Sequence, residues 1–204
     1  MRTQHALLGI VIVSVATLVM TGFALAEFSF NASPFEFDPG NTGTVVAQWV
    51  KHLGLPDPDD DGHSNFALLL SKNTATSTVA AAGAQIRGVQ GITLTELGYD
   101  FRAGGHCGAG APRFNVVTTD NVVHFIGCNS PFPTGSGALP GFSGWTRLRW
   151  TATGGVVPGF PPVLPTQTVQ SITIIFDEGT DQGNSSGMAV IDNIDINGVL
   201  IGSP

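Results

Sequence analysis

The stretch GGHCGAGAPRFNVVTTDNVVHFIGCNS, residues 104–130, decides the fold of this chain. Within it, residues 113–118 and 121–126 form two short runs of β-branched and aromatic residues around a Thr-Asp-Asn turn, which predicts a β-hairpin. Cys107 lies just before the first run and Cys128 just after the second. Antiparallel pairing brings both sulfurs to the open end of the hairpin. The spacing therefore predicts a disulfide between the two cysteines.

Runs of alternating apolar and polar residues on both sides of this hairpin indicate further strands. Residues 65–71 are apolar on both faces, which predicts a central strand. Residues 73–84 fit either one helical turn or a strand of small residues. The runs expected to form the other strands are residues 27–31, 35–37, 44–51, 65–71, 90–101, 145–151, 169–176 and 188–196.

The spacing of these runs indicates the fold class. No convincing helical pattern is present, and Gly and Pro punctuate the chain throughout. The sequence therefore predicts an all-β protein, an antiparallel two-sheet β-sandwich. Residues 169–176 and 188–196 flank a polar loop, so we expect them to pair as a long C-terminal hairpin.

The N-terminus has the three parts of a secretory leader. Arg2 precedes an apolar run over residues 6–20, and Ala24-Leu25-Ala26 follows as a small-residue cleavage site. This pattern predicts a signal peptide over residues 1–26 and a single mature domain over residues 27–204. The alternative is a membrane anchor that is retained, because the apolar run with its flanks approaches the length of a span.

The charge and cysteine content limit the partners and the compartment. The chain has 15 Asp and Glu residues against 8 Lys and Arg residues, a formal net charge of −7 at pH 7. Nucleic acid and anionic membranes are therefore not expected as partners. Two cysteines with a leader are typical of one disulfide in an oxidising compartment, so we expect a secreted protein, extracellular or periplasmic.

Two sets of residues resemble known proteins. IIFDEG (174–179) with VIDNIDING (190–198) resembles the last two strands of jelly-roll sandwiches of the carbohydrate-binding-module type. This resemblance implies a jelly-roll arrangement and a structural calcium near the terminal strands, at Asp192. The stretches FALLLSK (66–72), GVQGITL (88–94) and CGAGAPRF (107–114) are similar to secreted bacterial proteins of unknown function, which implies no activity.

An acidic turn gives the sharpest metal signal. Asp57, Asp59 and Asp61 alternate and are followed by a glycine, the spacing that lets side-chain oxygens wrap calcium, and Asn65 offers a further oxygen. The bidentate glutamate of a complete calcium loop is missing, because Leu68 stands at its place. The alternative is a solvated acidic turn.

A second oxygen-rich cluster lies near the C-terminus. Alternation places Asp192 and Asp195 on opposite faces of their strand, so not every member meets one ion, and the alternative is a polar hairpin loop. The residues of this cluster are Asp177, Glu178, Asp181, Asn184, Asp192 and Asp195.

Catalytic patterns are mostly missing from the sequence. The nucleophile motif G-x-S-x-G does not occur, and the histidines do not have metal-ligand spacing. Glu96 and Glu178 are candidates for a glycosidase carboxylate pair, although nothing in the sequence brings them together. A polysaccharide-active enzyme is therefore the last of the alternatives.

Residues 145–151 carry the candidate binding site. If Leu148 and Trp150 face the core, Trp145, Arg147 and Arg149 face outward, where an indole stacks on a sugar ring and guanidiniums bind carboxylates. The alternative is that both arginines pair with surface acids and the indole packs under a Pro-rich loop.

The binding hypothesis gives the expected function. We expect a secreted, non-catalytic module that binds a carbohydrate or an extracellular matrix polymer, with carboxylate-bearing polysaccharides tested first. A structural surface or matrix protein without a small ligand is the alternative.

Overall fold

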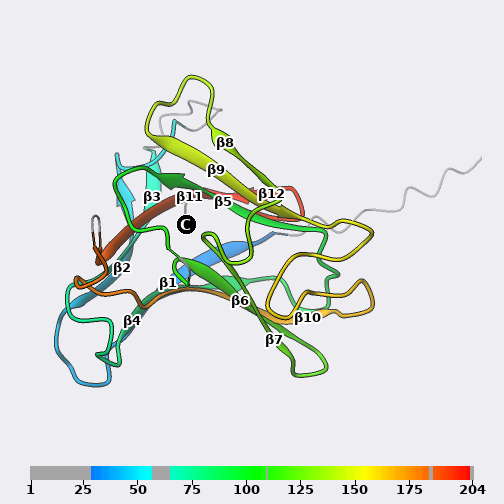
Figure 1. Ribbon diagram of the computed structural model, residues 1–204, viewed down its shortest axis with the longest axis horizontal. Helices are drawn as coiled ribbons and strands as arrows, with labels where there is room; N and C mark the ends of the chain where they lie inside the picture. Colours follow the sequence, from blue (N-terminus) through cyan, green and yellow to red (C-terminus); the bar gives the residue numbers. More distant parts are fainter. Residues whose placement is uncertain (1–28, 57–64, 109, 184–185, 203–204) are drawn as a thin grey trace, which may run out of the picture.

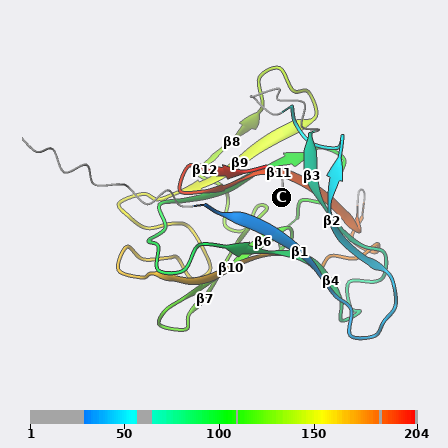
Figure 2. The same cartoon turned by 180° about the vertical axis from the view of Figure 1, so that it is seen from behind.

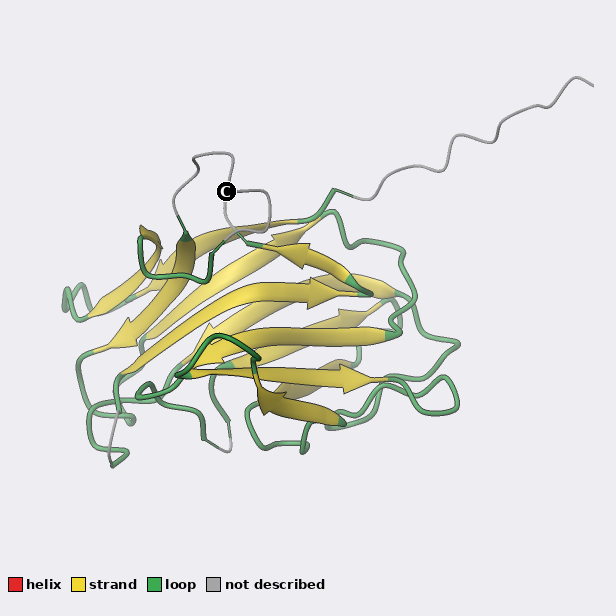
Figure 3. Cartoon of the chain, turned by 90° about the horizontal axis from the view of Figure 1, so that it is seen from above, coloured by secondary structure: helices red, strands yellow, loops and turns green. Residues whose placement is uncertain are grey.

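The structure is a computed structural model that describes residues 29–56, 65–108, 110–183 and 186–202. Within these residues the chain forms strands and loops only, as Figure 3 shows. The all-β prediction is confirmed. The strands are β1 (Asn31–Phe37), β2 (Val45–Lys51), β3 (Phe66–Lys72), β4 (Ala81–Arg87), β5 (Glu96–Arg102), β6 (Arg113–Thr118), β7 (Val123–Gly127), β8 (Gly135–Ala138), β9 (Trp145–Thr151), β10 (Val169–Phe176), β11 (Met188–Ile196) and β12 (Val199–Ile201).

The strands form two antiparallel sheets packed face to face. Sheet A has the order β1-β4-β10-β6-β7, and sheet B has the order β2-β3-β11-β5-β9-β8 with β12 added to β11. Figures 1 and 2 show them as the lower and upper layers of the molecule. This arrangement confirms the two-sheet β-sandwich.

The prediction that β10 and β11 pair as a C-terminal hairpin is wrong. β10 lies in sheet A between β4 and β6, whereas β11 lies in sheet B between β3 and β5. The connecting loop therefore crosses from one layer to the other. Alternation shows that both segments are strands with one buried face, but it does not identify the sheet in which each one pairs.

The core lies between the sheets and is built by the inward residue of each alternating pair. Tyr99 and Trp150 of sheet B meet Phe114 of sheet A, with ring centroids 5.5–6.3 Å apart. His124 is also buried, with both ring nitrogens bonded, to Thr118 Oγ1 at 3.0 Å and to the Pro161 carbonyl at 2.8 Å. It is a packed histidine.

The Ala-rich end of residues 73–84, which fitted a helical turn or a strand, forms the start of strand β4, and the strand expected over residues 90–101 begins only at Glu96. β8 consists of Gly-Ser-Gly-Ala with every residue exposed, so no hydrophobic pattern identifies it.

The leader assigned to residues 1–26 lies outside the described residues. Among the residues that are described, we find no helix with the length and apolar character needed to span a membrane.

Candidate functional site

The predicted disulfide is present and joins the two ends of the β6–β7 hairpin. Cys107 and Cys128 are bonded with their Cα atoms 5.2 Å apart. The Tyr99 hydroxyl lies 2.8 Å from the Pro112 carbonyl, to which it donates, and 3.2 Å from the Cys128 sulfur. Burial raises the pKa of this hydroxyl, so it remains a donor. The disulfide and the tyrosine together hold the loops that precede and follow the hairpin.

These loops border an open pocket of about 640 Å³, which we call the loop-end pocket. One wall comes from sheet B, through Phe101, Thr146 and Leu148. The other walls come from the loop that carries Cys107 and from the segment that follows Cys128. The pocket therefore opens where the two sheets separate, beside the disulfide.

Phe132 stands at this pocket with 78% of its surface exposed. Its neighbours fix the backbone: the Pro131 carbonyl accepts a hydrogen bond of 2.9 Å from Trp150 Nε1, and the Thr134 hydroxyl accepts one of 2.7 Å from the Thr151 amide. The same hydroxyl donates to the Arg149 carbonyl at 3.2 Å. The exposed ring is thus presented on a backbone tied to β9, which is the arrangement needed for a stacking surface.

Polar side chains surround this ring. Asn129 and Gln182 bring amide groups to the pocket, and Ser136 and Thr146 bring hydroxyls. Amides and hydroxyls both donate and accept hydrogen bonds, so the set fits a ligand with many hydroxyl groups. His106 completes the wall, with its ring packed edge-on against Phe176 at 5.9 Å between centroids.

The predicted binding stripe on β9 has the expected orientation but not the expected exposure. Leu148 and Trp150 face the core, whereas Trp145, Arg147 and Arg149 lie on the outer face of sheet B. However, Trp145 is only 9% exposed. The expectation that its indole is free is therefore wrong.

Trp145 is buried because two loops fold over this part of sheet B. It belongs to a small outer cluster with Leu55, Ala67 and Val190, against which Leu139 packs. The loop of residues 139–144 is tied down by hydrogen bonds from the Leu139 amide to the Trp145 carbonyl (3.2 Å) and from the Trp145 amide to the Phe142 carbonyl (3.3 Å). This is the alternative in which the indole packs under the Pro-rich loop.

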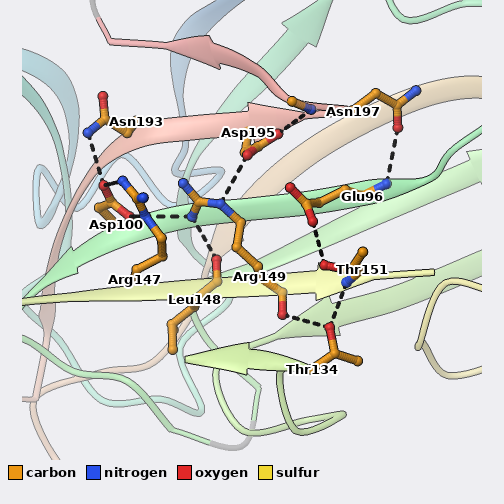
Figure 4. A network of polar contacts seen from close by, with 11 residues as sticks. Glu96, Asp100, Thr134, Arg147, Leu148, Arg149, Thr151, Asn193, Asp195 and Asn197 are labelled. Carbon is orange, nitrogen blue, oxygen red and sulfur yellow. Dashed lines mark hydrogen bonds and ion pairs between the residues drawn. The ribbon is translucent and has the colours of Figure 1, made fainter. Parts of the chain in front are cut away.

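Both arginines of the stripe are neutralised by acidic residues, as Figure 4 shows. Asp100 is fully buried and accepts hydrogen bonds from Arg147 Nε (3.0 Å), Arg147 Nη2 (3.1 Å) and Arg149 Nη1 (3.3 Å). Arg149 Nε also pairs with Asp195 at 3.0 Å. The hydrogen bond to Asp100 raises the pKa of Arg147, so this guanidinium stays charged. The guanidiniums stabilise the face of the sheet and are already paired.

Asp192 and Asp195 were expected on opposite faces, and this expectation is wrong. A register shift lies between them where β11 pairs with β5, and Asn193 has a φ of 46°. This bulge adds a residue to the strand, so both carboxylates lie on the outer face of sheet B. Burial raises the pKa of Asp195, and the Glu96 carboxylate nearby raises it further.

Among the described residues, the candidate metal ligands are not brought together. Asp57, Asp59 and Asp61 lie outside the described residues, and Asn65 lies just before β3, where its carbonyl accepts from the Gly54 amide at 3.3 Å. Asp192 is buried and accepts a 2.7 Å bond from the Leu55 amide. The described ranges contain no group of three or more His, Cys, Asp or Glu side chains arranged to hold a metal.

Asp177 lies at the end of β10, in the other sheet, and is engaged by basic groups. Its two oxygens accept from Arg113 Nη1 and Nη2, each at 2.7 Å. Burial alone would raise the pKa of this carboxyl, but the bonds and charge of Arg113 hold it below its usual value. The structure therefore places Asp177 and Asp192 apart.

A lysine supplies positive charge beside Asp177. The Lys72 ammonium is buried and donates to the carbonyls of Thr76 (3.0 Å), Thr78 (2.7 Å) and Asp177 (2.9 Å). Three converging carbonyls are a set of ligands that also suits a metal cation. Here the amine of the chain itself satisfies them.

The two glutamates weighed as a catalytic pair are likewise placed apart. Glu96 begins β5 of sheet B and accepts a hydrogen bond from the Thr151 hydroxyl. Glu178 follows β10 of sheet A and lines a separate pocket with Lys72 and Asp177.

No family model, curated protein or solved structure matches this chain. The loop-end pocket is therefore interpreted from its own geometry. Phe132 is absent from the sequence predictions, in which Trp145 is the stacking residue. The signal was present: an aromatic residue between two prolines, in a loop rich in glycine, does not belong to a strand and has no partner sheet to cover it.

Proposed function

We propose that this chain is a secreted, non-catalytic binding module for carbohydrate, and that the loop-end pocket is its site. The observation that carries the proposal is Phe132, which is 78% exposed on an anchored backbone beside amide and hydroxyl side chains. A flat apolar ring surrounded by hydrogen-bonding groups suits a sugar ring, which has an apolar face and a rim of hydroxyls. Neutral sugars are favoured because the polar groups around Phe132 are uncharged amides and hydroxyls.

The strand order supports a jelly-roll sandwich for this module. Eight strands form two four-stranded sets, β3-β11-β5-β9 and β4-β10-β6-β7, in which the late strands β10 and β11 are inserted between early ones. Interleaving of this kind is the arrangement of two Greek keys. β1, β2 and β8 then extend the edges, and β12 pairs with β11.

Secretion is supported by the leader-like residues 1–26 and by the Cys107–Cys128 disulfide. We assign structural calcium to the acidic turn with Asp57, Asp59 and Asp61, because Asp177 is already paired with Arg113. Calcium that binds the folded state raises the melting temperature by mass action. Identical melting temperatures in calcium and in chelator would show that calcium does not bind this turn.

The binding experiment uses the chain from residue 27 on a glycan array, followed by calorimetry with the best neutral oligosaccharide. Truncation of a stacking ring at a binding hot spot costs about 2 kcal/mol, so Phe132→Ala should weaken binding by roughly thirtyfold. Its melting temperature should not change, because the ring is exposed.

Phe160→Ala is the matched control, since Phe160 is also an exposed phenylalanine in a Pro-rich loop and does not line the pocket. Full affinity in Phe132→Ala would contradict the proposed site. A failure to bind any glycan, together with self-association of the purified chain, would favour the structural-protein alternative.

A further inference from the structure

The outer face of sheet A forms a second surface, which we call the platform. Strand register aligns its residues in three rows across β1, β4, β10, β6 and β7, opposite to the residues that build the core. Figure 1 shows this sheet as the lower layer, and no described segment crosses beneath it. The rows are Phe35, Gly83, Ile175, Arg113 and Gly127; Ser33, Gln85, Thr173, Asn115 and Phe125; and Asn31, Arg87, Ser171, Val117 and Val123.

Phe35 lies over Gly83 at one end of the platform. A Cβ built on Gly83 would lie only 2.5 Å from Phe35 Cζ and 2.8 Å from Cε1, so the ring occupies the space that any larger side chain would fill. Phe35 remains half-buried, with the Cζ end of its ring against β4. The glycine thus leaves the room that this ring occupies on the outer face of sheet A.

The other end of the platform carries Phe125, which is 42% exposed on β7. The Arg113 guanidinium lies over this ring, 5.9 Å from its centroid. β1 and β7 are separated by four strand spacings, or about 19 Å. A ligand that contacts both rings is therefore an extended chain and not a single sugar.

Short polar side chains lie between the two rings. Thr173 donates to Gln85 Oε1 at 3.3 Å, and Asn115 Oδ1 accepts from Arg113 Nε at 3.1 Å. The Asn115 side-chain nitrogen, in contrast to Oδ1, has no hydrogen-bond partner among the described residues, so it is available to a ligand. A row of amides and hydroxyls between two aromatic rings suits a hydroxylated polymer better than the apolar surface of a second protein.

The charge of the platform is opposite to that of the whole protein. The chain has 15 acidic and 8 basic residues, yet the three rows contain two arginines and no Asp or Glu. Arg113 is neutralised by Asp177, but Arg87 is exposed, and its Nε donates to the Ser33 hydroxyl at 3.0 Å. This face is the part of an acidic molecule where an anionic ligand meets least repulsion.

We propose that the platform binds an extended anionic polysaccharide, with its rings stacked on Phe35 and Phe125 and its acidic groups near Arg87. This site is separate from the loop-end pocket and does not depend on it. The acidic groups are carboxylates or sulfates, since both pair with a guanidinium.

The test measures binding of the chain from residue 27 to three immobilised polymers: a polyuronate, a sulfated polysaccharide and a neutral polysaccharide. Phe35→Ala should weaken binding to the anionic polymer by roughly tenfold, as for other aromatic anchors. Arg87→Glu should do the same without any effect on folding, because this side chain is exposed, and added salt should weaken binding by the unaltered chain. Phe142→Ala, an exposed phenylalanine in the 139–144 loop, should bind like the unaltered chain.

Tighter binding to the polyuronate identifies the acidic group as a carboxylate, and tighter binding to the sulfated polysaccharide identifies it as a sulfate. Equal binding to the neutral polymer, or full affinity in Arg87→Glu, would overturn the proposal. Loss of anionic-polymer binding in Phe132→Ala but not in Phe35→Ala would also overturn it, because the polymer would then occupy the loop-end pocket. Binding of the neutral oligosaccharide to Phe35→Ala tests the proposed function of the loop-end pocket separately from the platform.

Discussion

The outer faces of the two sheets follow the same alternation but have different surroundings. On sheet B, Trp145 is covered by loops, and Arg147 and Arg149 are held by Asp100 and Asp195. On sheet A, the residues between Phe35 and Phe125 are, apart from Ile175, small or polar, and no described segment covers them. An outward-facing aromatic or arginine side chain is thus available to a ligand only where no loop covers it and no acidic side chain pairs with it.

The comparison predicts opposite responses to mutation on the two faces. Residues of sheet B's outer face stabilise the fold, so their removal lowers the free energy of unfolding. Residues of the platform other than Arg113 contribute less to the fold, so their removal mainly affects binding.

The largest effect is expected for Asp100→Ala. This change leaves the buried Arg149 guanidinium without one of its carboxylates, and loss of one partner of a buried ion pair costs about 3–5 kcal/mol. Urea unfolding measures the difference. Arg87→Ala on the platform is the matched charged control, with an expected change within about 0.5 kcal/mol. Equal losses in both variants would remove the distinction between the faces.

Trp145→Ala should come next, with a loss of about 3 kcal/mol in unfolding free energy, because the indole fills the cluster with Leu55, Ala67 and Val190. Phe35→Ala, on the other face, should cost about 1 kcal/mol, since the ring is only half-buried. Thermal and urea unfolding of the two variants give the comparison. A larger loss for Phe35 than for Trp145 would show that the platform ring is part of the fold.

The contrast between the two faces also shows which features of the structure the sequence predicts. The β6–β7 hairpin, its disulfide and the inward orientation of Leu148 and Trp150 follow from local patterns, because alternation and turn residues act over a few positions. The burial of Trp145 does not follow, since it depends on where a glycine-rich loop folds.

The partners of β10 and β11 are a second case. The strands on either side of them, β4 and β6 for β10 and β3 and β5 for β11, lie about 50 to 120 residues away in the sequence, and many registers satisfy the same alternation. The platform could not be predicted either, because its rows exist only once five strands are aligned. Phe132 is different, since its Pro-Phe-Pro context was visible in the sequence.

The smallest effect concerns pH. The pKa of Asp177 is lowered from 3.8, so its pair with Arg113 contributes stability above about pH 3.8, and this contribution is lost as the pH falls through the lowered value. Asp177→Asn should therefore reduce the loss of stability in acid. Melting temperatures of both proteins between about pH 5 and pH 2 measure the effect.

Asp195 on sheet B is the control, because its pKa is shifted in the opposite direction to that of Asp177. Its pKa is raised, so its contribution is present below 3.8 and is lost as the pH rises through the raised value. Asp195→Asn should leave the acid loss of stability in place. One result would contradict the assigned directions of the two pKa shifts: a smaller loss of stability in acid for Asp195→Asn, but not for Asp177→Asn, than for the unaltered chain.

The most direct test of the account uses the indole N–H signals of the three tryptophans in an NMR titration with a neutral oligosaccharide. Trp150 Nε1 donates to the Pro131 carbonyl at 2.9 Å and reports on the loop that carries Phe132, whereas Trp145 reports on the covered face of sheet B. Trp49 Nε1, bonded to the Ala32 carbonyl at 3.0 Å, reports on the strands β1 and β2. We predict a saturable shift of the Trp150 signal while the Trp145 signal stays in place. A shift of Trp145 with Trp150 unmoved would place the ligand on the β9 stripe and contradict the account.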